Sequence, residues 1–212
     1  DNTFATALVQ RPLQLGATLS LTSTTKYING HSDALGGAVC TDSPEWHERM
    51  VFAQKALGLM PSPFDCWLIT RGVKTLPLRL RQQIANAAVL ADHLADHPKV
   101  EWTRYPHRSD HPQQAVALRQ MQGGGAIVTI GLDASREQAY AVCKALRWFT
   151  MAESLGGVES LICHPATMTH AAVSPEVKRK LGISDGLIRL SVGCEDVADL
   201  IADLDQALTT LS

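Results

Sequence analysis

Short apolar runs alternate with helix signals along this chain, and that alternation restricts its fold more than any other feature of the sequence. Four runs have the length and composition of β-strands, at residues 19–22, 38–41, 126–132 and 187–192. Helix starts or amphipathic stretches lie between them. Because strands and helices are interspersed rather than segregated, the sequence predicts a mixed α/β fold.

Several helix starts share one local chemistry. A serine can cap the free N–H groups, the proline after it needs no hydrogen-bond partner, and an acidic residue in the first turn favours the positive end of the helix dipole. This pattern occurs at Ser43-Pro44, Ser62-Pro63 and Ser174-Pro175. A capping box at Ser135 predicts a fourth helix start.

Two further helices follow from apolar periodicity. After Pro77, apolar residues recur at spacings of 4, 3, 4 and 3, which predicts an amphipathic helix ending near residues 97–98. Its core-facing residues would be Leu80, Ile84, Ala87, Ala91 and Leu94. The last helix is predicted from Asp196 to about Leu211. It would bury Val197, Leu200, Ile201, Leu204 and Leu208.

Charge and composition exclude several partners and sites. With a formal net charge of −2 and no basic run, the chain should bind neither nucleic acid nor an anionic membrane surface, and no apolar stretch is long enough to span a bilayer. Its five cysteines form no C-x-x-C pair, so we expect reduced, buried thiols in a cytoplasmic protein. His164 and His170 share no helix face and have no acidic residue at ligand spacing, so no metal site is predicted.

The segment 22–33 carries the most chemistry. It places Lys26 behind a cluster of Ser and Thr hydroxyls and ahead of a turn that contains Gly30. A lysine presented in this way can anchor an aldehyde cofactor covalently while the hydroxyls receive a phosphate. Taken alone, the segment is more typical of an ordinary polar loop with a solvated lysine, and other segments must decide.

Other segments occur in the same order as in a known family. They are Asp-Asn-Thr-Phe at 1–4, Ser-Thr-Thr-Lys at 23–26, Ser-Pro-Phe-Asp-Cys-Trp-Leu at 62–68, Arg-Gly-Val-Lys-Thr-Leu at 71–76, Glu-Ser-Leu-Gly-Gly at 153–157 and Leu-Ile-Arg-Leu-Ser-Val-Gly-Cys-Glu at 187–195. Together they resemble the Cys/Met-metabolism, or transsulfuration, family of enzymes that depend on pyridoxal 5′-phosphate (PLP). The resemblance is strongest to cystathionine γ-lyases and γ-synthases, and it runs to the last helix.

The resemblance implies a fold and a set of site residues. The fold would be the type I, aspartate-aminotransferase-like PLP architecture, with residues 1–75 ending the large cofactor domain and 76–212 forming the small domain. Lys26 would be the catalytic lysine that forms a Schiff base with PLP, and Ser154 and Arg189 would bind the carboxylate of the substrate. The cofactor-binding residues would be Asp1 at the ring nitrogen, Thr3 beside the ring, Ser23 and Thr25 at the phosphate, and Lys26.

The resemblance also implies an activity and partners. The expected reaction is γ-elimination or γ-replacement on cystathionine, and the alternatives are those of cystathionine β-lyase, methionine γ-lyase or an O-acylhomoserine sulfhydrylase. The expected partners are a small amino-acid substrate and further copies of the chain in a homotetramer. Since the family carries another half upstream of the Asp-Asn-Thr segment, that half is a further expected partner. An alternative of another class is a non-catalytic fragment or one piece of a split enzyme.

Overall fold

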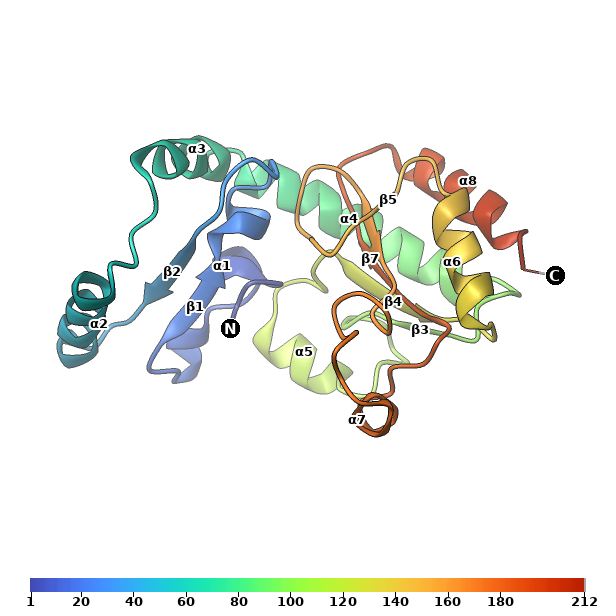
Figure 1. Ribbon diagram of the computed structural model, residues 1–212, viewed down its shortest axis with the longest axis horizontal. Helices are drawn as coiled ribbons and strands as arrows, with labels where there is room; N and C mark the ends of the chain where they lie inside the picture. The colour runs from blue at the N-terminus through green and yellow to red at the C-terminus, as the bar shows by residue number, and fades with distance from the viewer. Residues whose placement is uncertain (212) are drawn as a thin grey trace.

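The computed structural model describes residues 1–211 and contains two separate sheets (Figure 1). The smaller one pairs β1 (Ser20–Ser23) with β2 (Gly37–Cys40) in antiparallel fashion. The larger one has five strands in the order β3-β4-β7-β6-β5, of which β5 and β6 run parallel and the other neighbours antiparallel. Its strands are β3 (Trp102–Arg104), β4 (Ile127–Gly131), β5 (Thr150–Met151), β6 (Leu161–Cys163) and β7 (Leu187–Ser191). The mixed α/β class is confirmed.

Eight α-helices accompany the sheets within the described residues. They are α1 (Thr6–Val9), α2 (Pro44–Leu57), α3 (Pro63–Val73), α4 (Leu76–Ala95), α5 (Gln114–Gln120), α6 (Arg136–Ala145), α7 (Pro175–Lys180) and α8 (Val197–Leu208). The four predicted serine caps are confirmed, because each serine side chain accepts a hydrogen bond from a backbone N–H in the first turn of α2, α3, α6 or α7. Helix α4 begins at Leu76, so Pro77 lies inside its first turn rather than before it.

The core lies between the five-stranded sheet and three helices. Helix α4 contacts β3, β4 and α8, and α8 also contacts α6. In the central pair of strands, Val128 stands opposite Leu190 and Ile130 opposite Ile188, and all four are buried in the core. Because side chains alternate along a strand, Arg189 must project from the other face of the sheet.

Helix α8 confirms the predicted apolar stripe in part. Leu200, Leu204 and Leu208 are fully buried, whereas Val197 and Ile201 are only half-buried. A buried carboxylate was not foreseen within this stripe. Asp203 accepts hydrogen bonds from the backbone N–H groups of the segment that follows α6, at 2.8–3.4 Å from residues 147–149. It therefore satisfies polar groups that burial would otherwise leave without partners.

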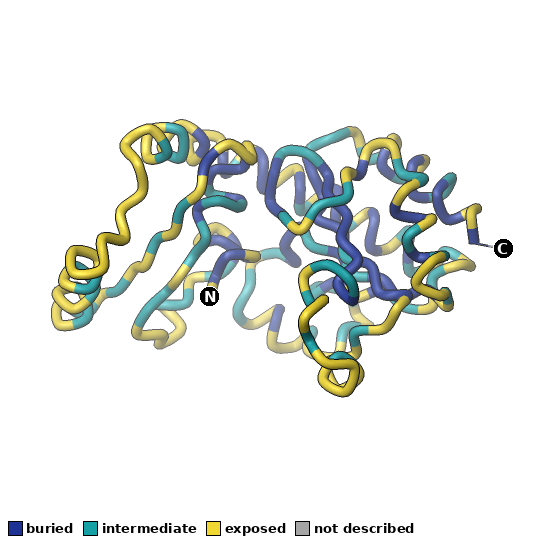
Figure 2. Tube along the Cα trace, viewed as in Figure 1, coloured by how far each residue is buried: buried dark blue, intermediate teal, exposed yellow. Residues whose placement is uncertain are grey.

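The surface around α2 is unusually open. Figure 2 shows α2 as mostly exposed and the segment that follows it as exposed, and no residue of α2 is buried. Cys143 and Cys163 are buried as expected, but Cys40 and Cys66 are exposed, so the expectation of buried thiols is wrong for those two. Within residues 1–211, no helix combines the length and apolar character needed to cross a bilayer.

Candidate active site

Lys26 interrupts the helical turn that follows β1. The turn covers Thr24–Ile28 with π-type spacing, and Lys26 within it has the non-helical angles φ −88° and ψ −128°. Hydrogen bonds fix both sides of this interruption: the N–H of Thr24 donates to the carbonyl of Gly36 at 2.9 Å, and the N–H of Gly30 donates to the carbonyl of Lys26 at 2.7 Å. The backbone therefore presents the lysine from a defined position.

The structure brings Lys26, Ser154 and Arg189 together. The Lys26 ammonium Nζ lies 3.0 Å from Ser154 Oγ, and the Arg189 guanidinium donates to the carbonyl oxygen of Ser154 at 3.1 Å. These residues come from the turn after β1, the loop after β5 and strand β7. Burial lowers the pKa of the Lys26 amine, and the positive charge of Arg189 lowers that pKa further.

A close backbone approach explains why the Ser154 loop reaches Lys26. Gly156 has φ +80°, and a Cβ there would lie 2.7 Å from the backbone nitrogen of Tyr27. Its own N–H donates to Ser191 Oγ at 2.9 Å, and the N–H of Val158 donates to the carbonyl of Gly30 at 2.9 Å. Glycine is thus required twice over, for a left-handed conformation and for contact with the lysine turn.

A second group links the start of the chain to β1. The N–H of Thr3 donates to Asp1 Oδ1 at 2.8 Å, and Thr3 Oγ1 accepts from the N–H of Ser23 at 2.9 Å. Thr25 lies slightly further on, where its Oγ1 accepts from the N–H of Gly36 at 3.0 Å. Asp1 is exposed and Thr3 is buried, so the carboxylate is accessible while the buried threonine holds it through its N–H.

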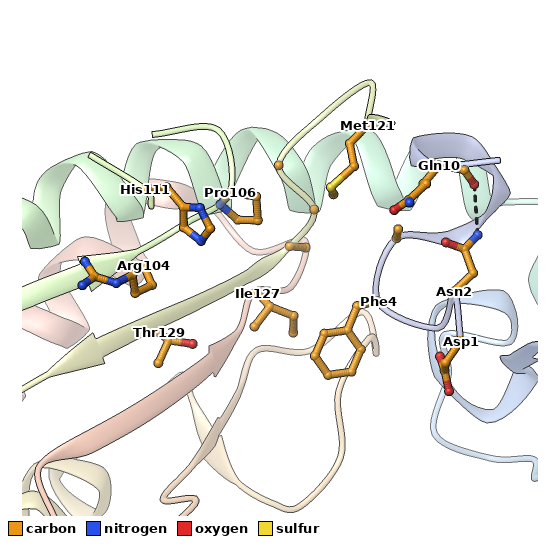
Figure 3. A pocket seen from close by; sticks show the side chains of 14 residues that line it. Asp1, Asn2, Phe4, Gln10, Arg104, Pro106, His111, Met121, Ile127 and Thr129 are labelled. Carbon is orange, nitrogen blue, oxygen red and sulfur yellow. Dashed lines mark hydrogen bonds between the residues drawn. The ribbon is translucent and has the colours of Figure 1, made fainter. Parts of the chain in front are cut away.

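The predicted site residues line two different cavities. Asp1 lines a cavity of about 350 Å³ whose opposite wall carries Arg104 and His111 (Figure 3). Thr25 and Ser154 line another cavity, of about 540 Å³. Lys26 lies beside the second cavity through its contact with Ser154. In the described part of the chain, Asp1 and Ser154, the contact partner of Lys26, therefore line different cavities.

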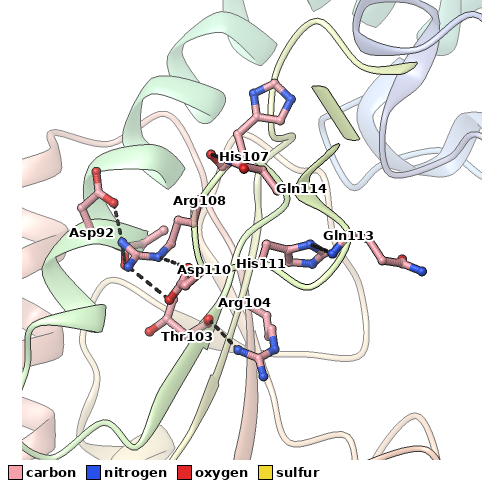
Figure 4. Close-up of polar contacts among 10 residues, drawn as sticks. Asp92, Thr103, Arg104, His107, Arg108, Asp110, His111, Gln113 and Gln114 are labelled. Atoms are coloured by element: carbon pink, nitrogen blue, oxygen red, sulfur yellow. Dashed lines mark hydrogen bonds and ion pairs between the residues drawn. The ribbon is translucent and has the colours of Figure 1, made fainter. Parts of the chain in front are cut away.

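An ion-pair cluster fixes the far wall of the first cavity. Arg108 pairs with Asp92 of α4 at 2.5 Å and with Asp110 at 3.1 Å (Figure 4). The loop between β3 and α5 is thereby tied to α4, and this loop supplies His111.

The side chains present fit PLP. Arg189 Nε is buried without an acceptor, and within residues 1–211 the Lys26 ammonium has one hydrogen-bond partner, Ser154. A cofactor with an aldehyde, a phosphate and a basic ring nitrogen would meet an amine at Lys26, hydroxyls at Ser23 and Thr25 and an exposed carboxylate at position 1. The guanidinium of Arg189 has a donor to spare for the carboxylate of a substrate. Among the same residues, no group of three or more His, Cys, Asp or Glu side chains is close enough to hold a metal ion.

The lowered pKa of Lys26 leads to a testable pH dependence. Burial and Arg189 both disfavour the ammonium form, so amine-specific acylation of Lys26 should reach half its maximal rate at a lower pH in the folded chain than in the urea-unfolded chain. Unfolding removes both causes, and the midpoint should then approach the ordinary lysine value of about 10.4. Competitive labelling over a pH series, followed by peptide mass spectrometry, measures both midpoints.

The lowered pKa of Lys26 also determines the direction in which the free energy of unfolding changes with pH. Between the lowered folded pKa and the ordinary unfolded pKa, the unfolded chain binds more protons at Lys26 than the folded chain does. The contribution of Lys26 to the free energy of unfolding should therefore rise with pH across this interval. Equal labelling midpoints in folded and unfolded chain would contradict both statements.

Sequence reasoning did not foresee the role of α4 at this site. The periodicity predicted a plain apolar stripe, yet Arg79, Gln83 and Asn86 are also buried on this helix. Their spacing of 4 and 3 places them on one face of the helix, as the spacing of the apolar stripe does. Polar residues on a helix are usually solvated, however, and nothing in the sequence marks these three as buried.

Comparisons with known proteins agree with this geometry. The family described as Cys/Met metabolism PLP-dependent enzyme matches residues 1–209. The cystathionine γ-synthase of Mycobacterium tuberculosis is 50% identical over 98% of this chain and 53% of its own, and the cystathionine γ-lyase of Dictyostelium discoideum is 49% identical over 98% and 54%. A solved cystathionine γ-synthase from Xanthomonas oryzae pv. oryzae in complex with cystathionine superposes with a TM-score of 0.96 at 49% identity, covering 99% of this chain and 54% of that one.

The chain spans about half the length of the curated relatives it matches. Within that span, the family match and the solved structure both cover nearly the whole chain. The type I PLP fold expected from the sequence is confirmed by the structural match. The chain belongs to the Cys/Met-metabolism family of PLP-dependent enzymes.

Proposed function

We propose that this chain forms the lysine-bearing part of a transsulfuration enzyme that acts on cystathionine as a γ-lyase or γ-synthase. The observation that carries the proposal is the contact of Lys26 Nζ with Ser154 Oγ at 3.0 Å, beside an arginine whose Nε is buried without an acceptor. That arrangement supplies an amine with a lowered pKa next to a binding group for an amino-acid carboxylate. Domains 1–75 and 76–212 would meet at this site.

In this proposal, bound PLP would supply an electron sink that stabilises negative charge on the α-carbon of the substrate. Ser23 and Thr25 would hold its phosphate, Thr3 would lie beside the ring, and the Asp1 carboxylate would keep the ring nitrogen protonated. Lys26 would hold the cofactor covalently when no substrate is present.

The proton transfers fall to Lys26. Its neutral amine would take the proton from the α-carbon of the substrate, and the resulting ammonium could return a proton as the leaving group departs through sulfur in a γ-lyase or through an ester oxygen in a γ-synthase. A lysine with an ordinary pKa is protonated near neutrality, so burial beside Arg189 prepares the amine for this role. Ser154 Oγ accepts a hydrogen bond from Nζ and thereby keeps the amine directed to one side of the loop.

Arg189 would bind the carboxylate of the substrate. A planar guanidinium can grip a carboxylate through two parallel hydrogen bonds. One of its nitrogens already donates to the backbone carbonyl of Ser154, which orients the group, while Nε has no acceptor among the described residues. The carboxylate would therefore bind to a cation whose position the fold has already set.

The exposed apolar residues support the proposal that other protein chains bind to this one. Large apolar side chains on and near α2 and α3 are more than half exposed, which is uncommon for a surface without a partner. They include Phe52, Leu57, Leu59, Met60, Phe64 and Trp67. We propose that the other half of a longer enzyme and further copies in a homotetramer cover them. The free thiols at Cys40 and Cys66 suit a reducing compartment such as the cytoplasm.

One experiment tests the proposed function. The protein at its full natural length is incubated with PLP, reduced with borohydride and digested, and the modified peptide is identified by mass spectrometry. A single reduced pyridoxyl phosphate on Lys26 is expected. The unreduced protein is then supplied with cystathionine, or with an activated homoserine ester and cysteine. Release of cysteine indicates a γ-lyase, and formation of cystathionine indicates a γ-synthase. No adduct on Lys26 would refute the proposal and would favour a non-catalytic fragment.

A further inference from the structure

Helix α4 carries a row of buried polar side chains along one strip of its surface. Arg79, Gln83 and Asn86 are spaced by 4 and 3 residues and are only 7%, 0% and 2% exposed. Residues at these spacings lie on one face of a helix. The row runs alongside the apolar stripe that includes Leu80 and Ala87.

Arg79 reaches the end of the lysine turn. Its guanidinium donates to the carbonyl oxygens of Tyr27 at 3.0 Å and Gly72 at 2.9 Å, with longer contacts to Ile28 at 3.3 Å and Asn29 at 3.4 Å. Its Nε donates to Thr75 Oγ1 at 3.0 Å. One side chain therefore holds the backbone that immediately follows Lys26.

The other two members of the row reach the other two site segments. Gln83 donates to the carbonyl oxygen of Gly157 at 2.6 Å, three residues after Ser154. Asn86 donates to the carbonyl oxygens of Gly193 at 3.1 Å and Glu195 at 2.8 Å, just beyond the strand that carries Arg189. Each member thus fixes a different segment of the candidate active site.

Two glycines make room for the Arg79 contact. A Cβ at Gly30, where φ is +72°, would lie 2.0 Å from Arg79 Nη1. A Cβ at Gly72 would lie 2.2 Å from the carbonyl oxygen of Asn29. The lysine turn, α3 and the guanidinium are therefore in direct contact, with no space for any larger residue.

The chemistry of Arg79 points to placement rather than to stability alone. In the described part of the chain, its acceptors are backbone carbonyls and one hydroxyl, without a carboxylate. A buried charge without an ionic partner is an expensive way to fill space, and an apolar side chain would fill it at lower cost. What the guanidinium adds is several donors in a fixed plane, which hold several carbonyls in one geometry.

We propose that Arg79, Gln83 and Asn86 are positioning residues that fix the Lys26 turn, the Ser154 loop and the end of the Arg189 strand relative to one another. This inference rests on the proposed function, since it takes Lys26, Ser154 and Arg189 as the site. None of the three touches the reacting groups, and each acts through a backbone carbonyl of the segment that it holds.

The first test follows the lysine turn without cofactor. In the full-length protein, Arg79→Met and Arg79→Lys are compared with Arg81→Met, which removes an exposed arginine from the same helix. Amide hydrogen exchange is measured at Asn29 and Gly30, whose N–H groups bond to Thr24 and Lys26. We expect exchange at least about tenfold faster in both Arg79 variants and unchanged in Arg81→Met, because the hydrogen bonds from the Arg79 guanidinium to the carbonyls of residues 27–29 order this turn and are lost in both variants. Unchanged protection in Arg79→Met would overturn the inference.

If the Arg79 variants do not fold, a variant at Gln83 tests whether the polar row of α4 positions the site. Gln83→Met keeps roughly the volume of the side chain. It removes the donor to the Gly157 carbonyl, and it also removes a buried amide oxygen that has no partner within residues 1–211, which offsets part of the loss of stability. A positioning role predicts that KM for the amino-acid substrate rises about tenfold with a smaller change in kcat, since the Ser154 loop binds the carboxylate. An unchanged KM would overturn the role of Gln83.

The two hypotheses can fail separately. Wild-type protein that takes up no PLP on Lys26 would refute the proposed function, whereas the exchange measurement on cofactor-free protein would still show whether Arg79 orders the turn. Wild-type protein that does take up PLP, together with Arg79 variants of normal protection, would refute the positioning row alone.

Discussion

Replacing Lys26 with alanine is expected to abolish turnover, with a loss of at least about 10⁴-fold in kcat. The change removes both the covalent link to PLP and the amine that moves protons, and each of these contributes separately to the rate. PLP can still bind through its phosphate and ring, but borohydride should then attach none of it to the chain. The measurements are kcat on cystathionine and the mass of the reduced protein.

Two controls separate loss of chemistry from loss of fold. Lys144→Ala removes an exposed lysine from the last turn of α6, outside the apolar surface of α2 and α3, and should leave kcat within about twofold, as expected for a surface substitution. Added methylamine should restore part of the activity of Lys26→Ala, increasingly at higher pH, because a small neutral amine can replace the missing base. Activity within tenfold of the wild type in Lys26→Ala would refute the assignment of Lys26.

Local chemistry explains which parts of the fold could be foreseen. The helix starts at Ser43, Ser62, Ser135 and Ser174 depend on residues within one turn, and all four are confirmed. Strands of two or three residues carry too little pattern to be recognised. For this reason β3, β5 and β6 were missed, although β6 pairs with the strand that carries Arg189.

The candidate site likewise has one part that could be predicted from the sequence and one part that could not. The resemblance placed Lys26, Ser154 and Arg189 in one site. In the structure the Lys26 amine contacts the Ser154 hydroxyl and the Arg189 guanidinium contacts the Ser154 backbone carbonyl, although the roles of the three residues stay predictions. What the sequence could not indicate was long-range support. Arg79 contacts the lysine turn across about fifty residues of chain, and Gln83 contacts the Ser154 loop across a still longer separation. Such contacts leave no local pattern, because only the folded backbone brings a carbonyl to each donor.

Replacing Arg189 with lysine is expected to reduce kcat/KM by about 10- to 100-fold, mainly through a higher KM for the amino acid. Lysine keeps the positive charge but cannot form two parallel hydrogen bonds to a carboxylate, and one charge-assisted hydrogen bond is worth roughly 1.5–3 kcal/mol. Arg189→Met removes the charge as well, so its loss should be larger still. Steady-state kinetics over a range of cystathionine concentrations separates KM from kcat.

Arg104 offers a matched control for Arg189. In the paired register, Arg104 of β3 stands beside Thr129 of β4, which in turn stands beside Arg189 of β7, so both arginines lie on the same face of the sheet. Arg104→Lys should leave KM unchanged, since Arg104 has no contact with the Ser154 loop among the described residues. An equal loss in both variants would mean that the sheet face as a whole, rather than a carboxylate contact, requires arginine.

Arg189→Met should also change the pH profile, and the direction can be derived. Burial is the larger cause of the lowered pKa of Lys26, and Arg189 is the second. Removing the guanidinium should therefore raise the pKa of Lys26 in the cofactor-free chain while leaving it below the ordinary lysine value. The midpoint of Lys26 acylation should move to higher pH in Arg189→Met and stay in place in Arg189→Lys, which keeps the charge. A midpoint that moves equally in both variants would show that the packing of arginine, rather than its charge, prepares the Lys26 amine.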